Sequence, residues 1–412
     1  MLKIVDSTNR RAVRALLAPE RTRDAATERR VAKIVDDVRR DRDRALLKYA
    51  RRFDDLWEPI EVSPGEMRRA AARVPRDVRA AIATAARSIG TVARKQVPKG
   101  WRATVAPGVT VEQRVTPLDR VGCYVPAGRY PLPSSLLMTA IPAAAAGVAE
   151  IVVACPRPAP VVMAAALEAG VSSLFRIGGA HAIAALAFGT ETVPRVDKIV
   201  GPGNRYVAAA KALVAADCGI DFYAGPTEIV IVSSKGQARW IAADLIAQAE
   251  HDPDARAVLI TPSQTLAARV AREVDAQMPD AGPARAALRA HGGIIVSASI
   301  AEALALANTA APEHLVVDDE KMARLVTTAG SLFVGPWSAQ VAGDYAIGSN
   351  HVLPTAGAAR VRGGLSAADF VRQITVQRLT RRGLRRIGAT VMTLAGAEGL
   401  QAHAASVAMR MK

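Results

Sequence analysis

Two groups of residues that could take part in catalysis or metal binding lie in the stretch 308–355 of a chain that is otherwise rich in alanine. The first is Pro312-Glu313-His314-Leu315, and the second is Gly343-Asp344-Tyr345 with the run from Asn350 and His351 to Thr355. A carboxylic acid beside an imidazole supplies two proton carriers with different intrinsic pKa values, which suits a reaction with more than one proton transfer. An Asp and a His in glycine-flanked loops can equally bind a metal ion. Taken alone, each cluster is also compatible with a hydrogen-bonded loop histidine or a surface ion pair.

Gln248 and His251 form another candidate group near the end of an expected helix, where a spacing of three residues places both side chains on one face. A histidine and an amide oxygen at this spacing can share one cation. A histidine at a helix C-terminus is, however, more often just a favourable charge beside the dipole. With Asp344 and His403 the pair makes a mixed set of nitrogen and oxygen ligands, which suits zinc better than magnesium or calcium. No sequence rule brings residues this distant together.

The loop Gly201-Pro202-Gly203-Asn204 lies between an expected strand and an expected helix. Backbone N–H groups at such a position can face a phosphate or a ribose, and the same residues also suit an ordinary turn. The sequence contains no Gly-x-Gly-x-x-Gly fingerprint, so an ordinary Rossmann dinucleotide site is not supported.

The composition predicts a soluble globular protein of two or three domains. The 412 residues are 50% hydrophobic, and 54 Lys and Arg against 38 Asp and Glu give a formal charge of +16. Such a charge is compatible with nucleic acid, but the arginines are spread over amphipathic helices and no stretch interleaves them with stacking aromatic residues. Three cysteines are too few for a disulfide framework, and the sequence has neither a signal peptide nor a membrane-spanning run. We therefore expect a cytoplasmic protein without a membrane or nucleic-acid partner.

The elements that would position these residues change in type along the chain. The first hundred residues read as helices, with apolar residues at 31, 34, 35 and 38 on one face. From Arg120 onward short β-rich runs alternate with helices, which predicts parallel, doubly wound sheets whose ligands lie at the carboxyl ends of the strands. Strands are expected at 121–125, 151–154, 173–177, 198–200, 229–232, 257–260, 293–296, 315–317 and 331–334.

After Thr355 a helical tail is expected, with Leu384, Ile387, Val391 and Leu394 at helical spacing. Its apolar face needs a partner, for which a second subunit is a candidate. The fold class is thus α/β, with two doubly wound, incomplete Rossmann-like parallel-sheet domains and small helical segments at both ends. The expected divisions are an N-terminal segment 1–22, a first α/β domain of 23–120 and 228–358, a second α/β domain of 121–227, and a C-terminal tail 359–412.

Six runs of the sequence resemble the histidinol dehydrogenase family, in the same order over nearly the whole chain. They are Val121 to Ser135, Gly178 to Glu191, Val196 to Asn204, Gln248 to His251, Pro312 to Leu315 and Gly343 to Thr355, and the resemblance continues to Glu398 and His403. It implies an NAD-dependent, two-step oxidation of L-histidinol through L-histidinal to L-histidine, the last step of histidine biosynthesis. NAD would be the cosubstrate.

The resemblance also implies a role for each matching residue. Gln248, His251, Asp344 and His403 would bind one zinc ion per subunit, and the metal would hold the substrate without carrying electrons. His314 would take the hydroxyl proton, and Glu313 would activate the water that hydrates the aldehyde. The other matching positions would contact the substrate at Thr227, His351 and Glu398 and the cofactor at Tyr124, His181 and Asn204.

The family forms homodimers in which the tail reaches the other subunit, so His403 and Glu398 would act in trans. Two departures from the family pattern stand out. Thr227 replaces the usual Ser and keeps the hydroxyl, whereas His181 replaces the usual Gln and is expected to alter NAD affinity or its pH dependence. Cys123 adjoins Tyr124, but no neighbouring residue would lower its pKa and the family scheme needs no thiol.

Two alternatives to a histidinol dehydrogenase stay open at this point. One is a paralogous zinc- and NAD-dependent dehydrogenase of another small polar alcohol, which the changes at Thr227 and His181 would allow. The other is a decayed enzyme that binds nucleic acid or anions through its charge of +16, which would predict salt-sensitive DNA retention and no bound zinc. The presence of all four expected metal ligands and of both proton carriers argues against this second alternative.

Overall fold

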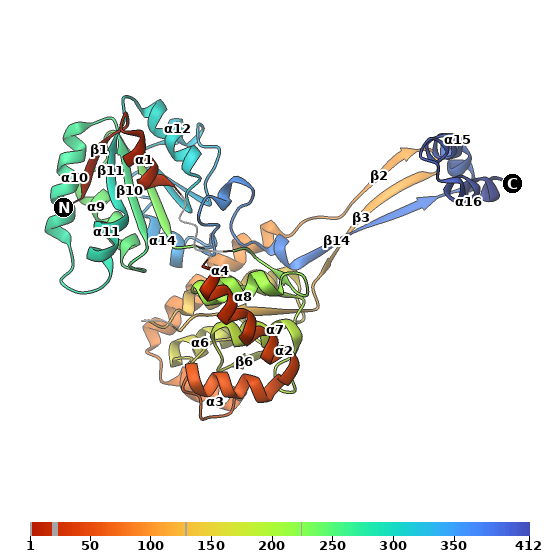
Figure 1. Ribbon diagram of the computed structural model, residues 1–412, viewed down its shortest axis with the longest axis horizontal. Helices are drawn as coiled ribbons and strands as arrows, with labels where there is room; N and C mark the ends of the chain where they lie inside the picture. Colours follow the sequence, from red (N-terminus) through yellow and green to blue (C-terminus); the bar gives the residue numbers. More distant parts are fainter. Residues whose placement is uncertain (1, 19–23, 128–129, 224) are drawn as a thin grey trace.

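The computed structural model describes residues 2–18, 24–127, 130–223 and 225–412. Residues 19–22 of the expected N-terminal segment, and Gly128 and Arg129 of the first matching run, lie outside the described residues. Figure 1 shows two α/β units, each built on a twisted sheet, and a long arm that carries the C-terminal helices away from both units. The predicted α/β class with two parallel sheets is confirmed.

The first unit contains a six-stranded parallel sheet with the order β1-β11-β10-β9-β12-β13. Alternate strand residues face opposite layers of helices, because successive side chains of a strand point to opposite faces. One layer consists of α9, α10 and α11, and the other contains α1, α12 and α13. The bounds are β1 (Lys3–Asp6), α1 (Arg10–Leu17), β9 (Glu228–Val232), α9 (Ala238–Ala249), β10 (Arg256–Thr261), α10 (Gln264–Gln277), α11 (Ala284–His291), β11 (Gly292–Val296), α12 (Ile300–Ala310), β12 (His314–Val317), α13 (Glu320–Ala323) and β13 (Ser331–Val334).

The second unit contains a five-stranded parallel sheet with the order β6-β5-β4-β7-β8. Its helices α5, α6, α7 and α8 connect the strands, and three helices from earlier in the chain, α2, α3 and α4, complete the two outer layers. The bounds are α2 (Ala25–Phe53), α3 (Pro64–Ala72), α4 (Arg76–Gln96), β4 (Arg120–Tyr124), α5 (Pro133–Ala146), β5 (Glu150–Ala154), α6 (Pro160–Glu168), β6 (Ser173–Phe175), α7 (Gly179–Phe188), β7 (Lys198–Val200), α8 (Arg205–Val214) and β8 (Gly219–Ile220).

Two expectations for the N-terminal region are wrong. Residues 3–6, expected to be helical, form β1 and pair in parallel with β11 at one edge of the six-stranded sheet. Residues 25–96 were grouped with 228–358, but their helices pack on the five-stranded sheet, where Val31, Val35 and Leu46 share a core with Ile183 of α7. An amphipathic helix needs an apolar face to cover, and its sequence does not specify which sheet provides that face.

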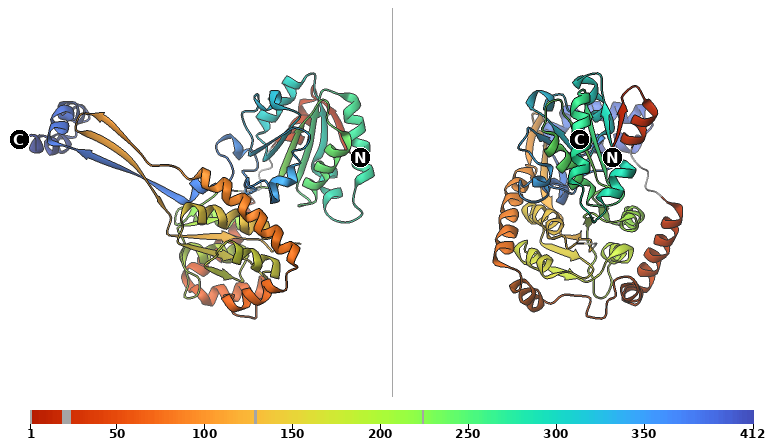
Figure 2. Two further views of the ribbon diagram at one scale, coloured as in Figure 1. Left: turned by 180° about the vertical axis from the view of Figure 1, so that it is seen from behind. Right: turned by 90° about the vertical axis from the view of Figure 1, so that its left-hand side faces the viewer.

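The arm is a three-stranded antiparallel sheet, with the order β14-β3-β2, that ends in two helices (Figure 2). Its elements are β2 (Trp101–Ala106), β3 (Val109–Pro117), β14 (Val371–Leu379), α15 (Arg381–Ala397) and α16 (Gln401–Met411). The tail is therefore not wholly helical as expected, and residues 101–117 lie in the arm. At the hairpin tip Gly108 has a φ of +84°, and a Cβ on Gly383 would lie 2.1 Å from the Gly108 carbonyl oxygen, so both positions need glycine.

The apolar face of the tail is only partly covered within the described chain. Leu384, Ile387 and Val391 of α15 are half-buried, whereas 59% of Leu394 is exposed. α16 buries none of its residues against the rest of the described chain. A search of the described residues found no helix with the length and apolar character needed to span a bilayer.

Candidate active site

Glu313 and His314 are adjacent and buried at the amino end of β12, beside the first residue of β9. The Glu313 Oε2 atom accepts hydrogen bonds from the Thr227 hydroxyl at 2.5 Å and from the Glu228 backbone N–H at 2.8 Å. The His314 Nδ1 atom lies 3.2 Å from the Glu228 carbonyl oxygen. A carbonyl oxygen only accepts, so Nδ1 carries the hydrogen and Nε2 is left as the basic nitrogen.

This position corrects the expectation that the ligand site lies at the carboxyl ends of the strands. Thr227 and Glu228 lie where β9 starts, and Glu313 and His314 lie where β12 starts. Gly330 must be a glycine, because a Cβ there would lie 2.6 Å from the Glu313 carbonyl oxygen. Glu313 and His314 therefore lie at the amino ends of the strands of the six-stranded sheet.

Burial dominates the electrostatics of this pair. It raises the pKa of Glu313 to about 8, although the hydrogen bonds from Thr227 and Glu228 oppose the shift. Burial and the nearby Glu313 carboxylate raise the pKa of Glu228 to about 7. Burial lowers the pKa of His314 and brings that of His351 to about 4. At neutral pH both imidazoles are neutral, and His314 can accept a proton.

We expect Glu313→Gln to stabilise the metal-free protein relative to wild type as the pH rises from 5 to 8. Glu313 has a folded-state pKa of about 8, above its ordinary value of 4.5, so its stabilising contribution is complete below 4.5 and is lost as the pH rises towards 8. A glutamine has no ionisation cost, so the difference in the free energy of unfolding between the variant and wild type should reach on the order of 4 kcal/mol by pH 8. This stability difference is measured from the urea concentrations at the midpoint of unfolding, at pH 5, 6.5 and 8 in the presence of chelator.

The control for this experiment is Glu320→Gln, which changes an exposed carboxylate just beyond the same strand. Its stability difference from wild type should not change between pH 5 and 8. A constant difference between Glu313→Gln and wild type over that range would contradict the raised pKa of Glu313.

Gln248 and His251 come from the end of α9, as expected from their spacing. Gln248 is fully buried, and its Nε2 group donates to the Thr227 hydroxyl at 2.5 Å. Its Oε1 atom is buried and has no hydrogen-bond partner in the described part of the chain. Leaving a buried acceptor unpaired costs roughly 1–3 kcal/mol, and a cation at Oε1 would remove that penalty. His251 is exposed just beyond the end of α9, and, in addition to burial, a positive charge on His251 would lower the pKa of both His314 and His351.

Asp344 belongs to α14 (Gln340–Tyr345) and lies on the other side of His314. Its Oδ2 atom accepts a hydrogen bond from Gln340 at 3.0 Å, and its Oδ1 atom lies 4.0 Å from His314 Nε2 and 3.9 Å from His351 Nδ1. Burial raises the pKa of Asp344, as for any carboxylate removed from water. A bound cation would favour its ionised form.

Glu398 and His403 are not brought to this site within one chain. Glu398 caps the end of α15 and His403 lies on α16, and both side chains are exposed at the far end of the arm (Figure 1). Among the described residues, no three His, Cys, Asp or Glu side chains are grouped so as to hold a metal ion. One chain thus places Gln248 and His251 at the end of α9 and Asp344 beside His314, and leaves His403 distant.

The loop that contains His351 joins the two α/β units. The His351 Nε2 atom lies 3.4 Å from the Ser135 hydroxyl of α5, and its Nδ1 atom lies 3.1 Å from the Asp344 carbonyl oxygen. Asn350 donates to the Met138 carbonyl of α5 at 2.6 Å. The site therefore lies between the units.

Two residues of this site were not among the sequence candidates. Ser135 ends the first matching run and follows a Pro-rich turn, and this turn is the sequence feature that could have marked Ser135 as a site residue. Glu228 follows Thr227, and its Oε1 atom accepts a hydrogen bond from the Ala356 N–H at 3.1 Å. A carboxylate at the start of an apolar strand is a weak signal, because most such residues are solvated.

The three expected cofactor residues follow strands of the five-stranded sheet at their carboxyl ends, in agreement with the sequence rule for such sheets. Tyr124 ends β4, and its buried hydroxyl accepts a hydrogen bond from the Gly179 N–H at 3.1 Å. Asn204 caps α8 and is exposed. Its side chain accepts from the N–H groups of Tyr206 and Val207, so these two amides are not free to face a phosphate as the loop interpretation suggested.

His181 does not point to an open surface. It is 2% exposed, and its Nε2 atom lies 2.7 Å from a carboxylate oxygen of Asp54 at the end of α2. The same oxygen accepts the Gly178 N–H at 2.9 Å, and the ring packs beside the stacked pair Tyr49 and Phe53, with both centroid distances at 6.2 Å. The imidazole thus supports the turn before α7, and any effect on a cofactor passes through that turn.

Cys123 is buried on the opposite face of β4 from Tyr124. Burial raises the pKa of its thiol to about 12, so the reactive thiolate is absent at neutral pH. This agrees with the expectation that the chemistry needs no thiol.

The comparisons with known proteins agree with one another. The family model described as histidinol dehydrogenase matches residues 18–411. A histidinol dehydrogenase of Halobacterium salinarum is 46% identical over 416 residues, covering 96% of this chain and 98% of that protein. One of Geobacter sulfurreducens is 43% identical over 413 residues, covering 97% and 96%. The crystal structure of histidinol dehydrogenase from Elizabethkingia anophelis matches with a TM-score of 0.94 and 33% identity, covering 100% of this chain and 98% of that one.

Proposed function

This chain belongs to the histidinol dehydrogenase family, an oxidoreductase family, and we propose that it oxidises L-histidinol through L-histidinal to L-histidine. NAD would accept both hydrides, and one zinc ion per subunit would be the metal. The reaction would be the last step of histidine biosynthesis. The observation that carries the proposal is the buried pair Glu313 and His314 beside the unpaired Oε1 atom of Gln248.

The residues present fit a zinc ion. Gln248 offers an amide oxygen with no other partner among the described residues, and Asp344 and His251 add a carboxylate and an imidazole. His403 of a second copy would complete a set of two nitrogen and two oxygen ligands, which suits zinc. When bound, the metal would hold the substrate and stabilise developing negative charge. The Thr227 hydroxyl fixes the amide group of Gln248, so that Oε1 is the atom left for the metal.

His314 is the proposed base for the hydroxyl proton. The Glu228 carbonyl holds the hydrogen on Nδ1, and burial keeps the ring neutral, so Nε2 accepts the proton as hydride leaves the carbinol carbon. The same ring can act again in the second oxidation, after it has released its proton.

Glu313 is the proposed residue that activates water for addition to the aldehyde. Two donors, Thr227 and the Glu228 amide, hold its Oε2 atom and leave Oε1 for the water. Its raised pKa makes the carboxylate a stronger base than an exposed glutamate, although less of it is ionised at neutral pH. The hydrated aldehyde then loses the second hydride from the same carbon. Two proton carriers side by side thus serve two oxidations at one carbon.

We propose that the enzyme is a homodimer in which Glu398 and His403 act in the site of the other subunit. The proposal is supported by the arm, which holds both side chains away from their own site (Figure 2). It is further supported by the exposed Leu394 and Met409 on the terminal helices, since exposed apolar residues on an extended arm favour burial against a partner.

The test is NADH formation from L-histidinol and NAD, measured on the native enzyme, after metal removal by a chelator, and after zinc is restored. We expect two NADH per histidinol, loss of activity with the metal and recovery with zinc. Other small polar alcohols serve as comparison substrates. Turnover of one of these without turnover of histidinol would favour the paralogous dehydrogenase, and no turnover of any alcohol by the zinc-loaded protein would contradict both.

A further inference from the structure

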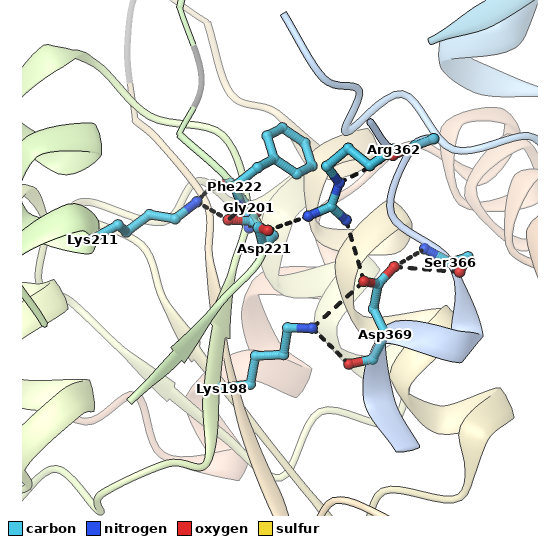
Figure 3. A network of polar contacts seen from close by, with 9 residues as sticks. Lys198, Gly201, Lys211, Asp221, Phe222, Arg362, Ser366 and Asp369 are labelled. Atoms are coloured by element: carbon cyan, nitrogen blue, oxygen red, sulfur yellow. Dashed lines mark hydrogen bonds and ion pairs between the residues drawn. The ribbon is translucent and has the colours of Figure 1, made fainter. Parts of the chain in front are cut away.

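The loop Gly201 to Asn204 is held by a buried ion pair that lies outside the acid–base site (Figure 3). The Asp221 Oδ2 atom accepts the Gly201 N–H at 2.8 Å, and the Lys211 ammonium group donates to the Gly201 carbonyl oxygen at 3.1 Å. The two charged side chains contact each other directly and are 2% and 5% exposed as residues. Both polar backbone groups of Gly201 are therefore engaged by one ion pair.

Gly201 needs this support because of where it lies. Its φ is +118°, and a Cβ at this position would lie 2.2 Å from the Tyr124 carbonyl oxygen. Only glycine can approach the end of β4 this closely. The ion pair therefore sets the position of the loop against Tyr124 at one end and, through the short connection 202–203, against Asn204 at the other.

A second layer of charged groups holds the same segment from the outside. Arg362 donates to the Asp221 carbonyl oxygen, and its guanidinium lies 4.6 Å from the centre of the Phe222 ring. Arg362 also contacts Asp369 at 3.2 Å, and Lys198 of β7 donates to the Asp369 carbonyl at 2.8 Å. Asp221 thus has backbone and side-chain partners on both sides, which limits its freedom to move away from Gly201.

The ion pair is poorly explained by stability alone. The free energy needed to remove two charges from water is about as large as the stabilisation from their attraction. Replacing a buried ion pair with apolar side chains is therefore often neutral or stabilising. The fixed orientation of the Gly201 peptide is, in contrast, something that an apolar pair cannot provide. The geometry therefore favours a positioning role.

We propose that Lys211 and Asp221 are positioning residues for the NAD site, which they preorganise by fixing the loop between Tyr124 and Asn204. This inference rests on the proposed function and on the expectation from the family resemblance that NAD binds beside Tyr124 and Asn204. A ligand binds more weakly when the protein loop that contacts it must first become ordered, because ordering the loop offsets part of the binding free energy. The pair should therefore affect cofactor affinity and leave the metal and histidinol sites unchanged.

The test uses the double variant Lys211→Met/Asp221→Leu in the full zinc-loaded enzyme. We expect the KM for NAD and the Kd for NADH to rise about tenfold, with the KM for histidinol and the zinc content unchanged. Single substitutions are avoided, since each leaves an uncompensated buried charge. The control is Arg120→Met/Glu150→Gln, which removes an ion pair at the amino ends of β4 and β5, away from the Gly201 loop, and should change none of these values.

A second variant, Lys211→Met/Asp221→Asn, keeps an acceptor for the Gly201 N–H and should bind NADH more tightly than the leucine variant. If the leucine variant does not fold, the asparagine variant is compared with wild type, and we expect a severalfold weaker NADH affinity because Gly201 has lost its donor. NADH affinities within about twofold of wild type in folded variants would overturn the proposal. Wild type that neither binds NADH nor oxidises histidinol would instead contradict the proposed function.

Discussion

Glu313→Gln is expected to lower the rate of the second oxidation, from histidinal to histidine, by about a hundredfold to ten-thousandfold, the usual range for removal of a positioned proton carrier. The glutamine carbonyl oxygen can take the place of Oε2 and accept from the Thr227 hydroxyl and the Glu228 N–H, so the local structure should persist. The lost property is the ability to take a proton from water. The second oxidation depends on that water, so the yield should fall from two NADH per histidinol towards one.

The measurement combines the rate of NADH formation with the final yield and with chemical trapping of histidinal. A suitable control is Glu250→Gln, which removes an exposed carboxylate next to His251 and should leave the rate and yield unchanged. Two NADH per histidinol at the wild-type rate in Glu313→Gln would show that another group activates the water. Loss of both oxidations without aldehyde accumulation would assign Glu313 to the first proton transfer.

His403→Ala is expected to form histidine at least as slowly as Glu313→Gln, and a mixture of the two variants should regain about a quarter of the wild-type rate of histidine formation. In the proposed dimer each site uses Glu313 from one chain and His403 from the other. Random exchange makes about half of the dimers mixed, and one of the two sites in a mixed dimer has both native residues. The exposed position of His403 at the end of the arm is the structural reason to expect this result.

The experiment requires unfolding and refolding the two variants together with zinc, and then assaying histidinol oxidation. Each variant refolded alone is the baseline. A third preparation, in which one chain carries both substitutions and the other is wild type, should contain no intact site in its mixed dimers. If complementation fails although a different affinity tag on each variant shows that native mixed dimers have formed, the trans arrangement is contradicted, because each substitution would then inactivate the site of its own chain.

Much of the sheet architecture was predictable from local pattern. The expected strand at 229–232 is β9, and the expected helix after it contains Gln248 on its last turn, because an apolar run and an amphipathic run differ in period. The arm was not predictable in this way. β2 and β14 are largely exposed and β3 is mostly half-buried, so these strands lack the regular burial of one face that marks a strand packed on a core.

The sequence by itself determined the pairs whose separation is set by the chain. Glu313 and His314 are adjacent, and Gln248 and His251 share a helix face, because covalent bonds and helix geometry fix these distances. Only the tertiary structure decided at which strand ends of the six-stranded sheet the proposed acid–base pair lies. Non-local contacts dock the helices 25–96 and the loop that contains His351 on the five-stranded sheet. These contacts place the carboxyl ends of the strands of the five-stranded sheet beside the amino ends of the strands of the six-stranded sheet. The rule that ligands bind at the carboxyl ends of parallel strands cannot predict this docking, because the docking depends on surfaces that are far apart in the chain.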